Sequence, residues 1–148
     1  MKRLALLALA GVVLAGCGGS SRLSKSAYEQ TLQTDGKAVQ KTITALTKTP
    51  TSSIAQFTTK IDDAEAALKK AADELESIKA PSDAIADNAA IVSGLRAIQA
   101  GLEKVKAHPT AATTIVGQIE GSPQLKAAAK ATADLTQKGY KVGVIGAP

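Results

Sequence analysis

The chain has 148 residues, of which 18 are basic and 13 acidic, and its formal net charge at neutral pH is +5. It has no tryptophan, and its only aromatic residues are Tyr28, Phe57 and Tyr140. Nucleic-acid binding usually shows a concentrated basic stripe with aromatic or arginine readers; here lysines alternate with carboxylates, which argues against a nucleic-acid partner.

The first seventeen residues are organised like a bacterial export signal. Two basic residues follow Met1, an apolar stretch runs from Leu4 to Ala15, and the only cysteine stands at position 17. A bilayer core of about 30 Å requires roughly 20 apolar residues, so this stretch is too short to span it. A charged start, a short apolar region and small residues at its end are instead typical of a signal peptide. We therefore expect residues 1–16 to be removed.

The last four residues of this segment, Leu14, Ala15, Gly16 and Cys17, resemble the lipobox of bacterial lipoproteins. The resemblance implies that the Cys17 thiol receives a diacylglycerol and that the leader is cut between Gly16 and Cys17. Two acyl chains give stable membrane anchoring, whereas one chain is marginal. The implied location is the bacterial cell envelope, on the extracytoplasmic face of a membrane. The alternative is a free, buried Cys17 that follows a transmembrane or uncleaved segment.

Cleavage would leave 132 residues (148 minus 16), a length typical of one domain with a single core. A lipidated Cys17 leaves no thiol for a disulfide, so apolar packing must hold the domain together. The residues after the cysteine, Gly18-Gly19-Ser20-Ser21, have the composition of a flexible linker. Residues 17–25 are accordingly predicted to be the lipidated cysteine and its tether.

A first helix is predicted from Ser26 to the Thr49-Pro50-Thr51-Ser52 segment. Ser26 followed three residues later by Glu29 is the pattern of a capping box. An apolar stripe continues through the segment at Tyr28, Leu32, Val39, Ile43 and Leu46.

The clearest periodicity lies between Ser53 and Lys79, where apolar residues recur at alternating spacings of three and four. They are Ile54, Phe57, Ile61, Ala64, Leu68, Ala71, Leu75 and Ile78. This spacing predicts a helix with a heptad seam. Such a seam suits either a bundle within one chain or a helical homodimer, so the oligomeric state stays open.

A third helix is predicted between the Ala80-Pro81-Ser82 break and His108-Pro109, because a residue before proline is disfavoured in a helix. Its apolar positions are Ile85, Ala89, Val92, Leu95, Ile98, Leu102 and Val105. Both connections between the three helices are short, which favours antiparallel neighbours.

In the C-terminal third of the sequence, a short helix is predicted within residues 110–120. A longer helix is predicted from Ser122-Pro123 to Lys138, with Gly139 as its left-handed cap. Residues 26–138 are therefore predicted to form an all-α, antiparallel bundle of about four helices. Residues 139–148 form an apolar, glycine-containing tail. We expect Val142, Val144 and Ile145 to dock on the bundle; the alternative is a disordered terminus.

Residues suited to catalysis or metal binding are scarce. His108 is the only histidine, and its position at a helix end suits the helix dipole or an exposed loop. The carboxylates that could supply an acid–base pair alternate with lysines, as on a solvated helix face: Asp62, Asp63, Glu65, Asp73, Glu74 and Glu76. No G-x-S-x-G is present. We predict no enzymatic activity, no metal and no cofactor.

The combined pattern is similar to small, alanine- and lysine-rich helical lipoproteins of bacteria that are themselves uncharacterised. We expect a membrane-anchored, non-enzymatic helical module of the envelope, which contacts another protein, the cell wall or a like chain. The alternative is a bundle that binds a small ligand or lipid, because alanine-rich seams can leave a gap that the apolar tail covers. An enzyme would require His108 beside a carboxylate and a hydroxyl inside a cleft.

Overall fold

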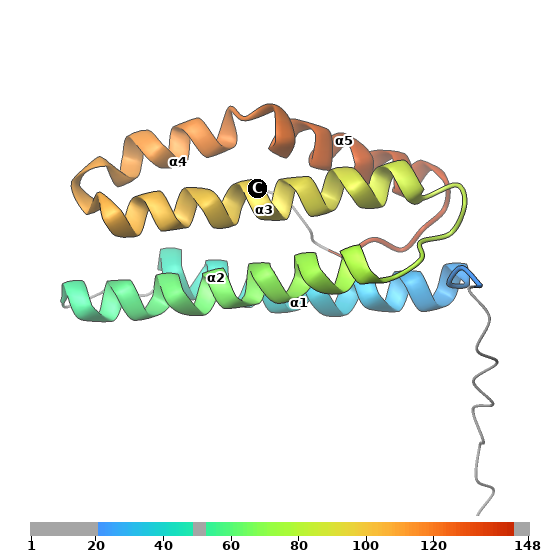
Figure 1. The fold of residues 1–148 in the computed structure, drawn as a ribbon, viewed down its shortest axis with the longest axis horizontal. Helices are drawn as coiled ribbons and strands as arrows, with labels where there is room; N and C mark the ends of the chain where they lie inside the picture. The colour runs from blue at the N-terminus through green and yellow to red at the C-terminus, as the bar shows by residue number, and fades with distance from the viewer. Residues whose placement is uncertain (1–20, 49–52, 144–148) are drawn as a thin grey trace, which may run out of the picture.

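The computed structural model describes residues 21–48 and 53–143, and these form a bundle of helices without any β-strand (Figure 1). The fold class predicted from the sequence is confirmed. The helices are α1 Lys25–Lys48, α2 Ile54–Ser77, α3 Ile85–Ala107, the short 3₁₀ helix η1 Pro109–Ala111, α4 Ala112–Glu120 and α5 Pro123–Gln137.

The first three helices form two consecutive antiparallel hairpins, α1 with α2 and α2 with α3 (Figure 1). The fourth position of the bundle is shared by two helices, because α4 and α5 run back along α3 one after the other. The fourth position is divided into two helices because α4 ends at Gly121 and Pro123 suits the first turn of α5. The Ser122 hydroxyl caps α5 by accepting the Leu125 N–H at 3.3 Å, as predicted.

The heptad seam of α2 lies in the core between α1 and α3. Its buried members are Ile61, Ala64, Leu68, Ala71 and Leu75, joined by Ala72. The seam is thus covered by helices of the same chain. The prediction was wrong for Ile54, whose residue is 77% exposed, because it is the first residue of α2 and lies at the end of the bundle.

Helix α1 begins differently from the sequence expectation. The Ser24 hydroxyl accepts the Ala27 N–H at 3.2 Å, so Ser24 and not Ser26 provides the cap. The Glu29 carboxylate instead accepts the backbone N–H of Lys141 at 3.1 Å, so the predicted capping box does not form. A distant segment has replaced the local partner that the spacing suggested.

The residues just before α1 are already fixed to the bundle. The Leu23 N–H donates to the carbonyl of Lys79 at 2.8 Å, and the Arg22 guanidinium donates to the carbonyl of Ala80 at 3.1 Å. Both acceptors belong to the connection between α2 and α3. Residues 22–25, which the sequence placed in the tether, therefore form part of the folded domain.

Two glycines seven residues apart allow α3 to approach its outer neighbours closely. A Cβ on Gly94 would lie 2.5 Å from the Cβ of Ala128 in α5. A Cβ on Gly101 would collide with the end of the Ile119 side chain in α4. The contact at Gly94 leaves no room for a larger residue, whereas at Gly101 the Ile119 side chain would have to move; α3 is the central helix against which α4 and α5 pack.

The chain leaves α5 through Gly139, whose φ of +75° is the left-handed cap predicted from the sequence. Tyr140 is then buried and Val142 packs against the core, which confirms docking for the first part of the tail. Val144 and Ile145 lie outside the described residues, as do Cys17 and the lipobox. No helix in the described ranges combines the length and apolar character needed to cross a bilayer.

Candidate functional site

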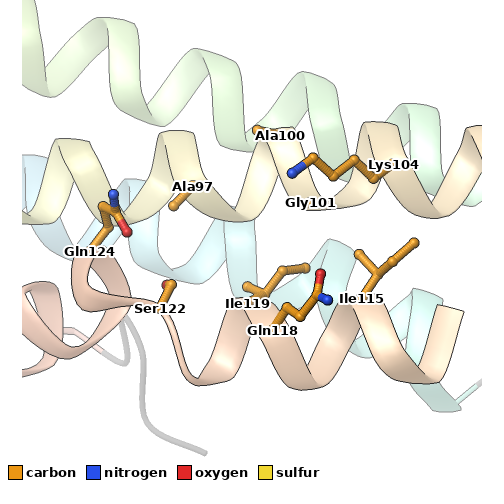
Figure 2. Close-up of a pocket in the computed structure, with 9 residues that line it drawn as sticks. All are labelled: Ala97, Ala100, Gly101, Lys104, Ile115, Gln118, Ile119, Ser122 and Gln124. Carbon is orange, nitrogen blue, oxygen red and sulfur yellow. The ribbon is translucent and has the colours of Figure 1, made fainter. Parts of the chain in front are cut away.

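A cleft with an apolar floor and exposed polar groups around it lies between α3, α4 and the start of α5. Its volume is about 230 Å³. Ala97, Ala100 and Gly101 line it from α3, and Ile115 and Ile119 line it from α4 (Figure 2). The polar lining residues are Lys104, Gln118, Ser122 and Gln124. We refer to this site as the α4 cleft.

The α4 cleft exists because α4 is short and weakly buried. Of its nine residues only Ile115 is buried, while Ile119 is half-buried and Val116 is 43% exposed. Gly117 faces open space, where an added Cβ would meet no atom within 4 Å. The wall that α4 provides is therefore held mainly by the side chains of Ile115 and Ile119.

Three of the four polar side chains around the α4 cleft have no partner among the described residues, whereas the Ser122 hydroxyl caps α5. Lys104, Gln118 and Gln124 make no side-chain hydrogen bond or ion pair with any residue in the described ranges. Figure 2 shows Lys104 extending back along α3 toward Gly101, and Gln118 rising from α4 toward α3. Lys104 is the only charged lining residue. The cleft therefore offers an apolar floor, one cation and two amide donors.

A second polar region lies at the opposite end of the bundle, where residues of four segments meet. We call it the tyrosine cluster, and it consists of Tyr28, Asp83, Asp87, Asn88, Lys138 and Tyr140. The Tyr28 hydroxyl donates to Asn88 Oδ1 at 3.0 Å. Asn88 Nδ2 donates to the carbonyl of Leu75 at 2.8 Å. These bonds satisfy polar groups that lie fully inside the protein.

The tyrosine cluster also fastens the end of α5 and the tail. Lys138 Nζ lies 2.6 Å from Asp87 Oδ2 and 2.6 Å from the carbonyl of Asp83. The Tyr140 hydroxyl donates to Asp83 Oδ1 at 2.7 Å. The Tyr28 and Tyr140 rings meet edge to face at 5.9 Å, and Lys25 Nζ lies 4.5 Å from the Tyr140 ring centre.

The tyrosine cluster was not predicted from the sequence. The apolar spacing placed Ala89 in the core, but Ala89 is exposed and its neighbours Asp87 and Asn88 are buried. The reason is that Lys138 and Tyr28, distant in sequence, provide their partners. No local signal in α3 could have identified them.

The electrostatics of the tyrosine cluster favour a structural role. Burial raises the pKa of Tyr28 well above its ordinary value, and burial together with the hydrogen bond to Asp83 raises the pKa of Tyr140 to about 12. The same hydrogen bond lowers the pKa of the Asp83 carboxyl. Both tyrosines therefore stay protonated at neutral pH and act as hydrogen-bond donors, not as bases.

One further buried carboxyl, Asp35 in α1, has an unusual environment. The residue is 2% exposed, and its Oδ2 has no hydrogen-bond partner among the described residues. Burial, and to a smaller extent the nearby Glu74, raise the pKa of Asp35 to about 6 although Lys70 acts in the opposite direction. No local pattern indicates this environment, because Asp35 falls between predicted apolar positions of the first helix.

The carboxylates of α2 form ion pairs on the surface. Lys69 and Lys70 pair with Asp73 and Glu74 one turn away, at 2.5 and 2.9 Å. Arg96 of α3 also bridges Asp73 and Glu76 at 2.5 and 3.1 Å, and Lys106 pairs with Asp62. All these side chains are more than a third exposed, which agrees with a solvated face at Asp62, Asp73, Glu74 and Glu76. The prediction was wrong for Glu65, whose side chain is 16% exposed and whose Oε1 has no hydrogen-bond partner among the described residues.

His108 is exposed at the end of α3, where its backbone N–H donates to the carbonyl of Lys104. Its imidazole is not brought beside a carboxylate and a hydroxyl by any contact in the structure. In the described residues, no group of three or more histidine, cysteine, aspartate or glutamate side chains could hold a metal ion.

Neither a protein-family model, nor a curated protein, nor a solved structure matches the chain.

Proposed function

We propose that this chain is a lipid-anchored, non-enzymatic helical module of the bacterial cell envelope. The observation that carries the proposal is the sequence Leu14-Ala15-Gly16-Cys17 after a basic and apolar leader. Diacylglycerol on Cys17 would hold the protein on the extracytoplasmic face of a membrane. The most plausible partners are another envelope protein, the cell wall or a second copy of the chain.

The described fold supports an anchor close to the domain. Arg22 is the first residue whose side chain is bonded to the bundle, so only residues 18–21 separate it from Cys17. Four residues span at most about 14 Å when fully extended. A lipid on Cys17 would therefore keep the end of the bundle that carries the tyrosine cluster near the membrane surface.

The polar groups of the described fold support a non-enzymatic role. The buried hydroxyls of Tyr28 and Tyr140 are committed to hydrogen bonds with Asn88 and Asp83. The lining of the α4 cleft contains no carboxylate, histidine or cysteine that could act as a base or nucleophile beside Ser122. The Ser122 hydroxyl itself accepts a backbone N–H.

The anchor is tested by expressing the full chain in a bacterium fed with an alkyne-labelled fatty acid. We expect label in the protein, a membrane location, and an intact mass that corresponds to a start at modified Cys17. The variant Cys17→Ser should lose the label and keep the leader, whereas Ser20→Ala should behave like the parent. An unprocessed start methionine with an unmodified thiol would refute the anchor.

The interaction role is tested separately by crosslinking in the native envelope. The anchored parent and the unanchored Cys17→Ser variant are compared at equal abundance, and crosslinked residues are mapped by mass spectrometry. We expect a reproducible partner, or a second copy, that contacts one contiguous face of the bundle. Recovery of lipid alone would contradict an interaction role.

A second candidate function is small-ligand binding, and the α4 cleft is the observation that favours it. Its apolar floor is ringed by Lys104, Gln118 and Gln124, whose polar groups have no partner in the described ranges. Ligand sites commonly combine a mostly apolar lining with a few convergent polar groups. Native mass spectrometry of the full chain, with a cleft-filling Ala97→Leu variant as control, would detect a retained ligand.

A further inference from the structure

We propose that the α4 cleft binds a short linear carboxylic acid, with the carboxylate held by Lys104 and the alkyl chain lying along Gly101 and Ile119. The proposal rests on the ligand-binding alternative above and specifies its ligand class. Three properties of the cleft lead to it: the shape of the floor, the charge of the rim and the weak attachment of α4.

The floor of the α4 cleft suits a thin alkyl chain. Gly101 and two alanines, Ala97 and Ala100, expose little more than backbone and methyl groups on the α3 side. From Ala97 to Lys104 the cleft follows seven residues of helix, a length of roughly 10 Å. Ile115 and Ile119 supply branched apolar side chains on the α4 side. An alkyl chain of about eight carbons has a matching length and removes this surface from water.

The charge of the rim selects the head group. Lys104 is the only charged residue of the lining, and no carboxylate there neutralises it. Its ammonium extends toward Gly101 in Figure 2, above the apolar floor. Gln118 lies across the cleft from Lys104 and provides an amide N–H₂ donor. A carboxylate can accept from both groups, and its hydrogen bond to Lys104 is charge-assisted.

The same lining disfavours other ligand classes. A cationic ligand would meet Lys104 without any compensating acid, because the lining has no aspartate or glutamate. A nucleotide or other flat ring system would find no aromatic side chain on which to stack. The volume of about 230 Å³ is also below the usual range for drug-sized ligands, roughly 300–1,000 Å³.

The attachment of α4 provides a way for the alkyl chain to enter. Ile115 is the only buried residue of α4, and the end of the Ile119 side chain fills the space in front of Gly101. Displacing the end of the Ile119 side chain would therefore uncover the α3 backbone at Gly101. The ligand would take the place that the end of the Ile119 side chain occupies in the free protein.

The experiment uses the full chain in nanodiscs of zwitterionic lipid, with ¹³C-labelled isoleucine methyl groups, and adds octanoate. We expect saturable shifts of the Ile115 and Ile119 resonances, while those of Ile61 and Ile91 in the core stay unchanged. Octan-1-ol has the same chain without the charge, and octyltrimethylammonium reverses the charge. Both should bind more weakly than octanoate.

Variants test separately the contact with the carboxylate and the contact with the alkyl chain. Lys104→Gln should weaken octanoate binding about fivefold, as expected for one exposed ionic contact, and should leave octan-1-ol binding unchanged. Lys126→Gln, which removes an equal charge from α5 outside the cleft, should change neither. Ala97→Leu, at a half-buried lining position, should abolish both by filling the floor.

Three results would overturn the proposal: no saturable shift at Ile115 and Ile119, equal affinity for octanoate and octan-1-ol, or equal octanoate affinity of the parent and Lys104→Gln. The shifts are measured whether or not Cys17 is modified. Failure of the anchor and failure of the cleft are therefore separate observations.

Discussion

The tyrosine cluster and the α4 cleft differ in how their polar groups are used. Around Tyr28 and Tyr140, buried donors and acceptors are bonded to one another across segments distant in sequence. Around the cleft, Lys104, Gln118 and Gln124 have no partner in the described ranges. The comparison indicates that the cluster stabilises the fold, whereas the cleft contributes little to stability and is free to bind or move.

The largest expected effect comes from removing the centre of the tyrosine cluster. Tyr28→Ala deletes a side chain that is 0% exposed and leaves Asn88 Oδ1 without its donor. We expect a loss of about 3–5 kcal/mol in the free energy of unfolding, measured by urea denaturation. Tyr28→Phe keeps the ring and should cost only about 1–2 kcal/mol. Ile119→Ala in the cleft should cost less than Tyr28→Ala; an equal or larger loss would contradict the comparison.

The same substitution, glycine to alanine, at two positions of α3 tests how firmly α5 and α4 are held, with smaller expected changes in stability. Glycine to alanine within a helix gains up to about 1 kcal/mol of intrinsic stability. In Gly94→Ala this gain is outweighed, because the new methyl group meets the Cβ of Ala128, which moves only with its backbone. We expect a net loss of about 1–2 kcal/mol in thermal or urea unfolding.

In Gly101→Ala the new methyl group meets only the flexible end of Ile119, so we expect the stability to change by less than about 0.5 kcal/mol. The Ile119 methyl resonance should shift as its side chain turns away. A loss as large as that of Gly94→Ala would mean that α4 is held as firmly as α5.

Asp35 provides a test that depends on pH. Its pKa is raised in the folded state to about 6, so its favourable contribution exists at low pH and is lost as the pH rises through about 6. Asp35→Asn should therefore stabilise the protein by about 1 kcal/mol at pH 7.5 and have little effect at pH 4. The raised pKa of Glu65 also lowers the stability as the pH rises. Because Glu65 is present in both the parent and Asp35→Asn, its contribution cancels in the difference between their free energies of unfolding. A difference independent of pH would contradict this account.

The smallest expected effect concerns the rim of the cleft. Lys104→Gln removes an exposed charge without a partner, so the free energy of unfolding should change by less than about 0.5 kcal/mol. A larger loss in urea denaturation would show that Lys104 already serves the fold, most simply through the dipole at the end of α3. Lys126→Gln provides the matched comparison.

The sequence predicted the parts of the structure that depend on local periodicity. The seam of α2, the break at Pro81, the cap at Ser122 and the left-handed Gly139 all follow from spacing and backbone preference, and all are confirmed. The prediction was wrong where a distant residue decides the outcome. Glu29 bonds to Lys141 instead of forming a capping box, and Asp87 is buried because Lys138 reaches it.

The cleft was predicted only as a possible gap between alanine-rich helices. Gly101 and Ile119 are ordinary residues within their own segments, and their contact depends on the turn at Pro109–Ala111 that folds α4 back along α3. Periodicity describes which face of a helix is apolar, but it does not determine which neighbour covers that face. Lipidation of Cys17 stays a prediction, because those residues lie outside the described ranges.

The hydrogen bond between Leu23 and Lys79 determines how far from the membrane the α4 cleft would lie in an anchored protein. It fixes the start of the domain to the connection that leads into α3. Ala97, where the cleft begins, stands twelve residues after Ile85, the first residue of α3, which is about 18 Å of rigid helix. On an anchored protein standing upright, the opening would lie above the headgroup layer. The carboxylic acid would then enter the cleft from the surrounding aqueous phase and not from the lipid leaflet.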